Sequence, residues 1–169
     1  MNDPIKDIIK TDSGEITFLW HSGKTINDLK PFQIYGFCLN DDGKVCLVKD
    51  KEETRFTLPG GHIDAGETAE RALIREFEEE AQFQPGNVEL LGTLEVKVVD
   101  KNSQVTDHHQ QVRFICKVHN VPEFVPGKDG WKTEERIFVD PNKLPEYIDW
   151  LSYPTGKAQF EDFLKYLDK

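Results

Sequence analysis

The residues best suited to chemistry in this chain are three glutamates in a short acidic run, Glu76, Glu79 and Glu80. On a helix, where successive residues lie about 100° apart, these three carboxylates share an arc of roughly 100°. Like charges at this spacing repel one another, and anions near a helix C-terminus oppose the helix dipole. A divalent cation removes the conflict, and hard cations such as Mg²⁺ prefer carboxylate oxygens. The run therefore indicates a metal site, with a solvated acidic helix face as the alternative.

The segment that must position these carboxylates has the pattern of a loop followed by a helix. Two glycines, Gly61 and Gly66, mark the loop, and Thr68 suits the N-cap because its hydroxyl can accept from an unpaired amide of the first turn. Apolar residues at i, i+4 spacing then form one stripe: Ala69, Leu73, Phe77 and Ala81. We therefore expect a helix that buries this stripe and holds the glutamates at its border with solvent.

The spacing across residues 61–83, GHIDAGETAERALIREFEEEAQF, is more specific than an acidic run. It resembles the Nudix box, G-x5-E-x7-R-E-U-x-E-E-x-G-U with U apolar. The matching positions are Gly61, Glu67, Arg75, Glu76, Phe77, Glu79, Glu80 and Phe83. With typical residue usage, six fixed identities arise by chance in fewer than roughly 10⁻⁶ of windows. The one departure is Gln82, where the family has a glycine that commonly caps the helix with a positive φ.

This resemblance implies a hydrolase that cleaves a nucleoside diphosphate linked to another moiety, with Mg²⁺ or, as a substitute, Mn²⁺. By similarity, Glu76, Glu79 and Glu80 are the catalytic residues and metal ligands, and the Gly61 carbonyl is a further ligand. The resemblance gives Glu67 and Arg75 a supporting role, in which they lock the loop to the helix. The chemistry agrees, because a metal ion offsets the diphosphate charge that repels a nucleophile.

Length and composition describe a single globular domain, residues 1–169, in which we expect residues 1–14 to form a loose N-terminal leader. The formal net charge of −10 disfavours binding to a nucleic-acid duplex, which generally needs a basic surface. No apolar run is long enough to span a membrane, and the first residues do not resemble a signal peptide. We therefore expect a cytoplasmic protein whose three cysteines are buried free thiols. The oligomeric state stays open.

The order of the elements predicts an α/β fold. Strand patterns occupy residues 15–20, 32–40, 44–49, 56–58, 88–99, 111–118 and 131–139. The helix at 68–81 interrupts this series, residues 141–147 suit a short helix, and the apolar spacing in 155–167 predicts a closing helix. This order is consistent with the α/β/α sandwich and mixed central sheet that the Nudix resemblance implies.

Four residues outside the three glutamates are candidates for substrate contact. Arg55 precedes the box, His62 follows its first glycine, His108 lies in the polar segment 101–109, which we expect to be a loop, and Glu135 lies in the strand at 131–139. Each could equally be an ordinary surface side chain. For a nucleobase, the aromatic faces of Phe32, Tyr35 and Trp131 could provide stacking, although packing is their commoner role.

The sequence therefore predicts a Nudix-type pyrophosphohydrolase that takes a small phosphorylated substrate, either a nucleoside triphosphate or a nucleoside diphosphate derivative. One alternative is a Nudix-fold module that binds a nucleotide or a protein without turnover. Its expected signature, a missing box glutamate, is absent. A second alternative is an isoprenoid diphosphate isomerase, which needs a reactive cysteine near the site. Cys38 and Cys46 lie instead in predicted strands.

Overall fold

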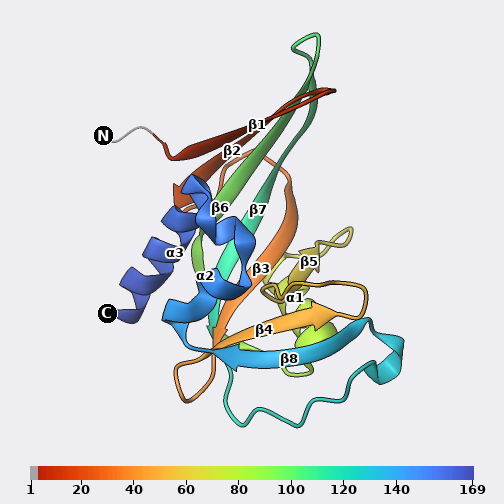
Figure 1. Ribbon diagram of the computed structural model, residues 1–169, viewed down its shortest axis with the longest axis vertical. Coiled ribbons are helices and arrows are strands. Elements are labelled where there is room, and N and C mark those ends of the chain that lie inside the picture. The colour runs from red at the N-terminus through yellow and green to blue at the C-terminus, as the bar shows by residue number, and fades with distance from the viewer. Residues whose placement is uncertain (1–3) are drawn as a thin grey trace.

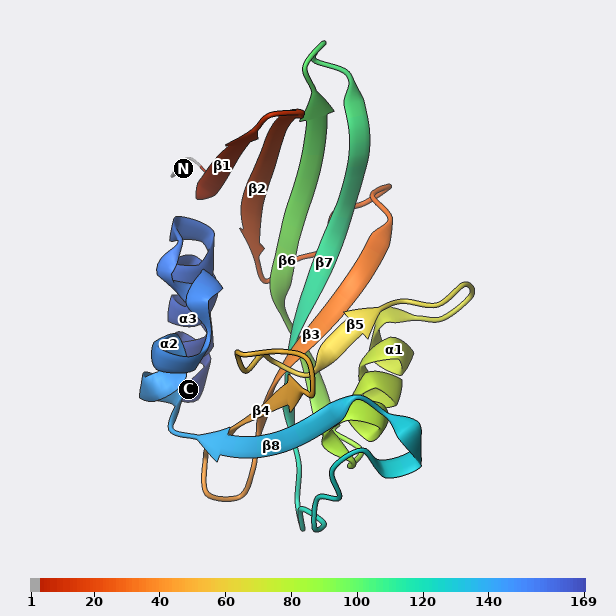
Figure 2. The same cartoon turned by 45° about the vertical axis from the view of Figure 1, so that its right-hand side comes forward.

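The computed structural model describes residues 4–169, which form one mixed sheet with helices on both faces (Figures 1 and 2). The strands are β1 (Lys6–Thr11), β2 (Gly14–Ser22), β3 (Pro31–Leu39), β4 (Val45–Asp50), β5 (Gly60–His62), β6 (Gly86–Asp100), β7 (Val105–Lys117) and β8 (Thr133–Val139). Their order is β1-β2-β6-β7-β3-β4-β8, and β5 pairs with β3. Only β3 and β7 pair in parallel, while the other pairs are antiparallel. The predicted mixed central sheet is therefore confirmed.

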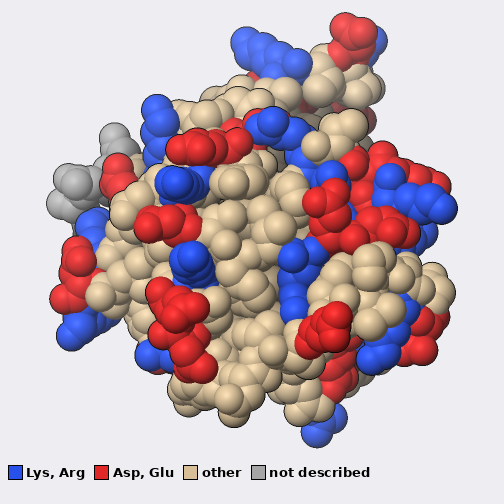
Figure 3. Space-filling model, turned by 60° about the horizontal axis from the view of Figure 1, so that its bottom comes forward, with Lys and Arg blue, Asp and Glu red and all other residues tan. Residues whose placement is uncertain are grey.

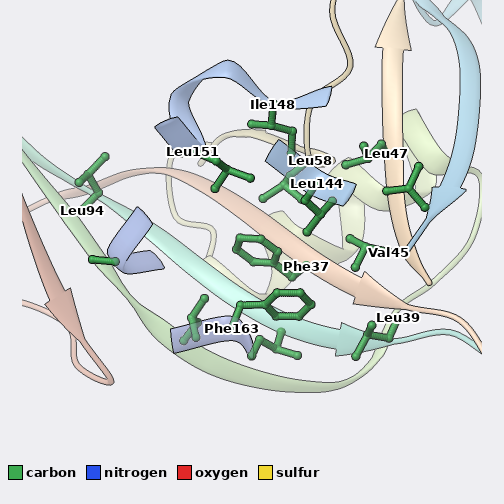
Figure 4. Packing of buried hydrophobic residues seen from close by; sticks show 14 of the residues in the cluster. Phe37, Leu39, Val45, Leu47, Leu58, Leu94, Leu144, Ile148, Leu151 and Phe163 are labelled. Carbon is green, nitrogen blue, oxygen red and sulfur yellow. The ribbon is translucent and has the colours of Figure 1, made fainter. Parts of the chain in front are cut away.

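Helices α2 (Leu144–Tyr147) and α3 (Pro154–Leu167) cover one face of the sheet, as Figure 2 shows. The apolar spacing of α3 directs Ala158 and Phe163 into the core. The ring of Phe163 stacks on Phe37 of β3, with their centroids 4.6 Å apart (Figure 4). Leu144 and Leu151 are buried in the same cluster, so the closing helix and the segment before it seal this face.

Helix α1 (Ala69–Glu76) lies on the other face of the sheet. Its buried residues Leu73 and Ala72, together with Phe77 beyond its end, pack on Ile34 of β3. The three cysteines also lie in this layer, and all are buried and free, as predicted: Cys38, Cys46 and Cys116. The two helical layers and the sheet between them form the expected α/β/α sandwich.

Three expectations about local structure are wrong. Residues 6–11 are not a loose leader but the edge strand β1, which pairs with β2 along its whole length; residues 1–3 lie outside the described part. Residues 101–109 are not all loop, because β7 begins at Val105 and extends the β6–β7 hairpin. The strand that enters the box is not 56–58 but β5, since Thr57 makes only an isolated bridge with Val48.

The remaining helical segments are short. They comprise one turn of π-helix at Phe77–Ala81 and 3-10 turns at Lys128–Gly130, Pro141–Lys143 and Asp149–Ser152. Among residues 4–169, no helix has both the length and the apolar character needed to cross a membrane.

Candidate active site

Helix α1 begins as the sequence predicts. The Oγ1 of Thr68 accepts a hydrogen bond of 3.2 Å from the Arg71 N–H, which satisfies one free amide of the first turn. The helix that the sequence predicts to Ala81 is α-helical only as far as Glu76, because the turn Phe77–Ala81 is π-helical. A π turn adds a residue to the turn and changes the direction in which side chains point, and such turns are frequent at functional sites. The regular spacing of about 100° that we expected for Glu79 and Glu80 is therefore wrong in detail.

Arg75 joins the loop to the helix, as the resemblance implies. Its Nε and Nη2 donate to the two Glu67 carboxylate oxygens at 2.9 and 3.0 Å. Nη2 also donates to the His62 carbonyl at 2.9 Å, and Nη1 donates to Glu76 Oε1 at 2.9 Å. The hydrogen bond from Arg75 holds the pKa of the Glu67 carboxyl below its usual range. One guanidinium thus fixes the loop carbonyl, the loop carboxylate and the first of the three candidate catalytic carboxylates.

The Glu80 carboxylate turns towards β5. Its Oε2 accepts a hydrogen bond of 3.0 Å from the Gly60 N–H. Burial is the main cause that raises the pKa of Glu80 to about 8; the hydrogen bond from the Gly60 N–H offsets part of this rise, and the nearby charges of Glu76, Asp50 and Glu79 contribute to it. Burial also raises the pKa of Glu76, partly offset by Arg75. A buried carboxylate with acidic neighbours favours a proton or a cation, which neutralises the local negative charge.

Gly61 leaves no space for a side chain beside Glu76. A Cβ on Gly61 would lie 2.6 Å from Glu76 Oε1 and 2.8 Å from its Cδ. A side chain at this position would displace the Glu76 carboxylate, so glycine lets the β5 backbone lie against it.

These features form one site in which β5 contacts Glu76 and Glu80, and Arg75 contacts Glu76 and Glu79. A family model described as the NUDIX domain matches residues 30–158, more than half of the 169 residues. The chain belongs to the Nudix family. The prediction of a Nudix-type pyrophosphohydrolase is thereby confirmed at the level of the family.

Individual Nudix relatives agree with this assignment. The chain is 32% identical over 129 residues to an ADP-ribose pyrophosphatase of Methanocaldococcus jannaschii, covering 70% of this chain and 72% of that protein. It is 29% identical over 131 residues to an RNA pyrophosphohydrolase of Baumannia cicadellinicola, covering 72% of this chain and 77% of that protein. In fold it is similar to the crystal structure of a mutant pyrophosphohydrolase of Bacillus subtilis, with a TM-score of 0.68 and 15% identity over 89% of this chain and 92% of that one.

The Nudix carboxylates suit a hard divalent cation in the chemistry of their oxygen donors, but they do not converge on a common point. Within residues 4–169, no three Asp, Glu, His or Cys side chains form a ready metal-binding cluster. Glu76 is held by Arg75, and Glu80 is held by Gly60. In Figure 3, Asp and Glu side chains form a dense group on the right-hand side of the molecule, where Figure 1 shows α1 and β5. The carboxylate oxygens are therefore donors of the right type for a cation. Such a cation would compete with Arg75 for the carboxylates.

The four secondary candidates lie in different settings. His62 belongs to the site, since its carbonyl binds Arg75 and its ring meets Phe32 edge-on with centroids 4.8 Å apart. Arg55 forms an ion pair with Asp149. The other two residues form ion pairs within the sheet, His108 with Glu95 at 2.7 Å and Glu135 with Lys49 at 2.5 Å.

Two residues near the Nudix site were missed by sequence reasoning. Gly60 supplies the N–H that holds Glu80, and it has a φ of +158° close to the Tyr35 side chain. Asp50 at the end of β4 adds negative charge beside Glu80. The Pro59-Gly60-Gly61 sequence signals a turn, but the β3–β5 pairing that directs the Gly60 amide towards Glu80 involves residues far apart in the chain. No local pattern could have identified Asp50.

Proposed function

We propose that this Nudix protein hydrolyses the diphosphate linkage of a nucleotide-like substrate through attack of water at phosphorus, with Mg²⁺ as the cofactor and Mn²⁺ as a substitute. The observation that carries the proposal is that Glu76 lies against Gly61 and Glu80 accepts from the Gly60 N–H, while Arg75 contacts both Glu76 and Glu79. The two named relatives support it, because both are described as cleaving a pyrophosphate linkage.

Each residue of the site has a role in this proposal. Glu76, Glu79 and Glu80, with the Gly61 carbonyl, would hold the cation. When bound, the cation offsets the negative charge of the diphosphate and lowers the pKa of water. Glu79 or Glu80 would accept the proton of the attacking water, because a carboxylate beside the phosphorus serves as a general base. Arg75 and Glu67 would keep the loop carbonyls in place by the bidentate contact described above.

The test is the release of phosphate, pyrophosphate or nucleoside monophosphate from a panel that includes nucleoside triphosphates, ADP-ribose and a nucleotide sugar. Each assay is run with Mg²⁺, with Mn²⁺ and with a chelator. Release that depends on the metal, and that Glu79→Gln abolishes in a folded protein, supports the proposal. Folded protein that releases nothing from any substrate, yet binds a nucleotide, would instead identify the non-catalytic binding module.

The isomerase alternative conflicts with the state of the cysteines. Burial raises the pKa of Cys46 and of Cys116 well above the usual value, and both thiols lie within the core. A thiol with a raised pKa is a poor nucleophile and a poor acid–base catalyst at neutral pH. The structure therefore favours water as the reactant over a cysteine.

A further inference from the structure

A cavity of about 480 Å³ lies between the sheet and the segment that leads into α3, with Tyr35 of β3 in its wall. Its walls are mostly apolar, and four of the lining residues are aromatic: Phe18, Tyr35, Trp150 and Tyr153. Tyr153 is 56% exposed, so its ring stands at the solvent boundary. Ligand sites typically have 300–1,000 Å³, mostly apolar walls and a few polar groups. This volume and lining suit a flat ring system that stacks on aromatic faces.

Arg113 is the cationic residue of the cavity wall and is only 4% exposed. The other polar residues of the wall are Asp7, Thr57, Gln111, Thr155 and Gln159. The centre of the Arg113 guanidinium lies 4.8 Å from the Tyr35 ring and 5.5 Å from the Trp150 ring. Nε donates to Gln159 Oε1 at 2.9 Å, and Nη2 donates to Gln111 Oε1 at 3.0 Å. The third nitrogen, Nη1, has no hydrogen-bond partner anywhere in residues 4–169.

Arg113 is therefore a buried cation held by two neutral amides and two aromatic rings. Its side chain forms no ion pair with any carboxylate in the described part of the chain. Burial without a compensating anion lowers the pKa of Arg113 to about 10. An unpaired donor on a buried charge is costly, and a native protein rarely keeps one without a function. An acceptor group on a ligand would satisfy it.

The cavity adjoins the catalytic carboxylates through one backbone contact. Tyr35, which forms part of the cavity wall, pairs with Gly60 in the β3–β5 ladder. The Gly60 N–H in turn donates to Glu80 at 3.0 Å. Burial raises the pKa of Tyr35, Arg113 offsets part of this rise, and the charges of Glu80 and Glu76 add a smaller contribution. An extended nucleotide would pass Tyr35 and Gly60 to bring its phosphates from the cavity to the box.

We propose that Arg113 recognises the C6 oxygen of a 6-oxopurine held in this cavity, so that guanine and hypoxanthine nucleotides bind in preference to adenine nucleotides. The proposal rests on the proposed nucleotide hydrolysis and names its substrate class. A guanidinium has donors and no acceptor, so it pairs with a keto oxygen and opposes an amino group. Arginine reads guanine by the same oxygen in nucleic-acid complexes, where adenine presents an amino group instead.

The test is isothermal titration calorimetry of the full chain with inosine, guanosine and adenosine monophosphates in the presence of a chelator. Inosine and adenosine monophosphates share the purine ring and the phosphate, and they differ in having an oxo or an amino group at C6. We expect inosine and guanosine monophosphates to bind about 10-fold or more tightly than adenosine monophosphate. Equal affinity of the wild-type protein for all three would overturn the proposal.

Substitution isolates the contribution of Arg113. In Arg113→Met the affinity ratio of inosine to adenosine monophosphate should fall close to one, whereas Arg71→Met should keep the wild-type ratio. Arg71 is a matched control because it is an exposed arginine on the outer side of α1. Thermal melts of both variants establish that they are folded. A folded Arg113→Met protein that retains the wild-type ratio contradicts the assignment.

A measurement on the wild-type chain covers the case in which Arg113→Met does not fold. Nitrogen-15 NMR of the arginine side chains should show that inosine monophosphate shifts the Arg113 guanidinium signal and that adenosine monophosphate does so far less. An Arg113 signal that inosine monophosphate leaves unchanged overturns the proposal.

Failure of this proposal differs from failure of the proposed hydrolysis. Selective binding of inosine monophosphate without turnover of any substrate of the panel would reject the hydrolase and support the cavity assignment. Metal-dependent turnover with equal monophosphate affinities would support the hydrolase and reject the role of Arg113.

Discussion

The side-chain amide of Gln82 forms two hydrogen bonds with the backbone of Val125. Its Nε2 donates to the Val125 carbonyl at 2.7 Å, and its Oε1 accepts from the Val125 N–H at 2.9 Å. Gln82 also has a φ of +61°, in the left-handed region where the family's usual glycine is free of strain. The departure from the box therefore keeps the backbone shape of a glycine cap and adds an attachment for the segment between β7 and β8.

Gln82→Gly should loosen that segment without unfolding the protein. Glycine removes the cost of a positive φ, but it also removes both hydrogen bonds to Val125. We expect faster hydrogen exchange at the Val125 amide and little change in melting temperature. Gln82→Asn, which tolerates the same φ but has a shorter amide, should show the same faster exchange. Exchange at Val125 that is unchanged in Gln82→Gly would show that the side chain does not hold the segment.

Glu79→Gln should lower turnover by several orders of magnitude and leave the melting temperature within a few degrees of the wild type. The only hydrogen bond of the Glu79 side chain in the described residues is a long one of 3.5 Å to Arg75, so its loss costs the fold little. The matched control is Glu78→Gln, since Glu78 is exposed on the outer side of the same segment. Steady-state kinetics should show near wild-type turnover for this control. Equal losses in the two variants would contradict a specific role for Glu79.

Gly61→Ala should lower turnover by about 100-fold through displacement of the Glu76 carboxylate, because small misplacements of catalytic groups are costly. The added Cβ would lie 2.6 Å from Glu76 Oε1. Gly86→Ala is the control, because a Cβ there meets nothing closer than the Lys117 carbonyl at 3.8 Å. Kinetics at saturating Mg²⁺ compare the two variants. Full activity in Gly61→Ala would mean that Glu76 does not need its present position.

The stability of chelator-treated protein should fall as the pH rises from 5 to 8. The pKa of Glu80 is raised to about 8 in the folded state, whereas an unfolded glutamate titrates near about 4.3. Between these values the folded state binds more protons, so the free energy of unfolding decreases with pH. Melting temperatures should show a flatter pH dependence for Glu80→Gln and the wild-type slope for Glu78→Gln. A slope unchanged in Glu80→Gln would contradict the raised pKa.

The sequence predicted the residues that form the centre of the site because they lie within 23 consecutive positions. The Thr68 cap, the buried stripe of α1 and the Arg75–Glu67 contact all occur within a few turns of chain, where spacing and side-chain type determine the geometry. The π turn after Glu76 could not be predicted, because nothing in the acidic run distinguishes it from a regular helix. Edge strand β1 could not be predicted because polar residues interrupt its apolar pattern, and the strand forms by pairing with β2.

The cavity was beyond sequence reasoning for a different reason. Arg113 lies in β7 and is buried only because Gln159 of α3 and Trp150 of the preceding turn close over it. An arginine in a strand is usually exposed, so residue type alone favours the opposite conclusion. Residue type does suggest stacking for Tyr35, and its side chain lines the cavity. The contacts that define this cavity come from strands and helices brought together only by the complete fold.

The three cysteines form a built-in reporter of unfolding. Cys38 of β3 and Cys116 of β7 are register partners, and both are fully buried with Cys46 under the helical segment that carries the box glutamates. A thiol-reactive dye can reach them only when that helix separates from the sheet. The rate of labelling in native buffer therefore measures how often this layer opens, without any added probe or engineered cysteine.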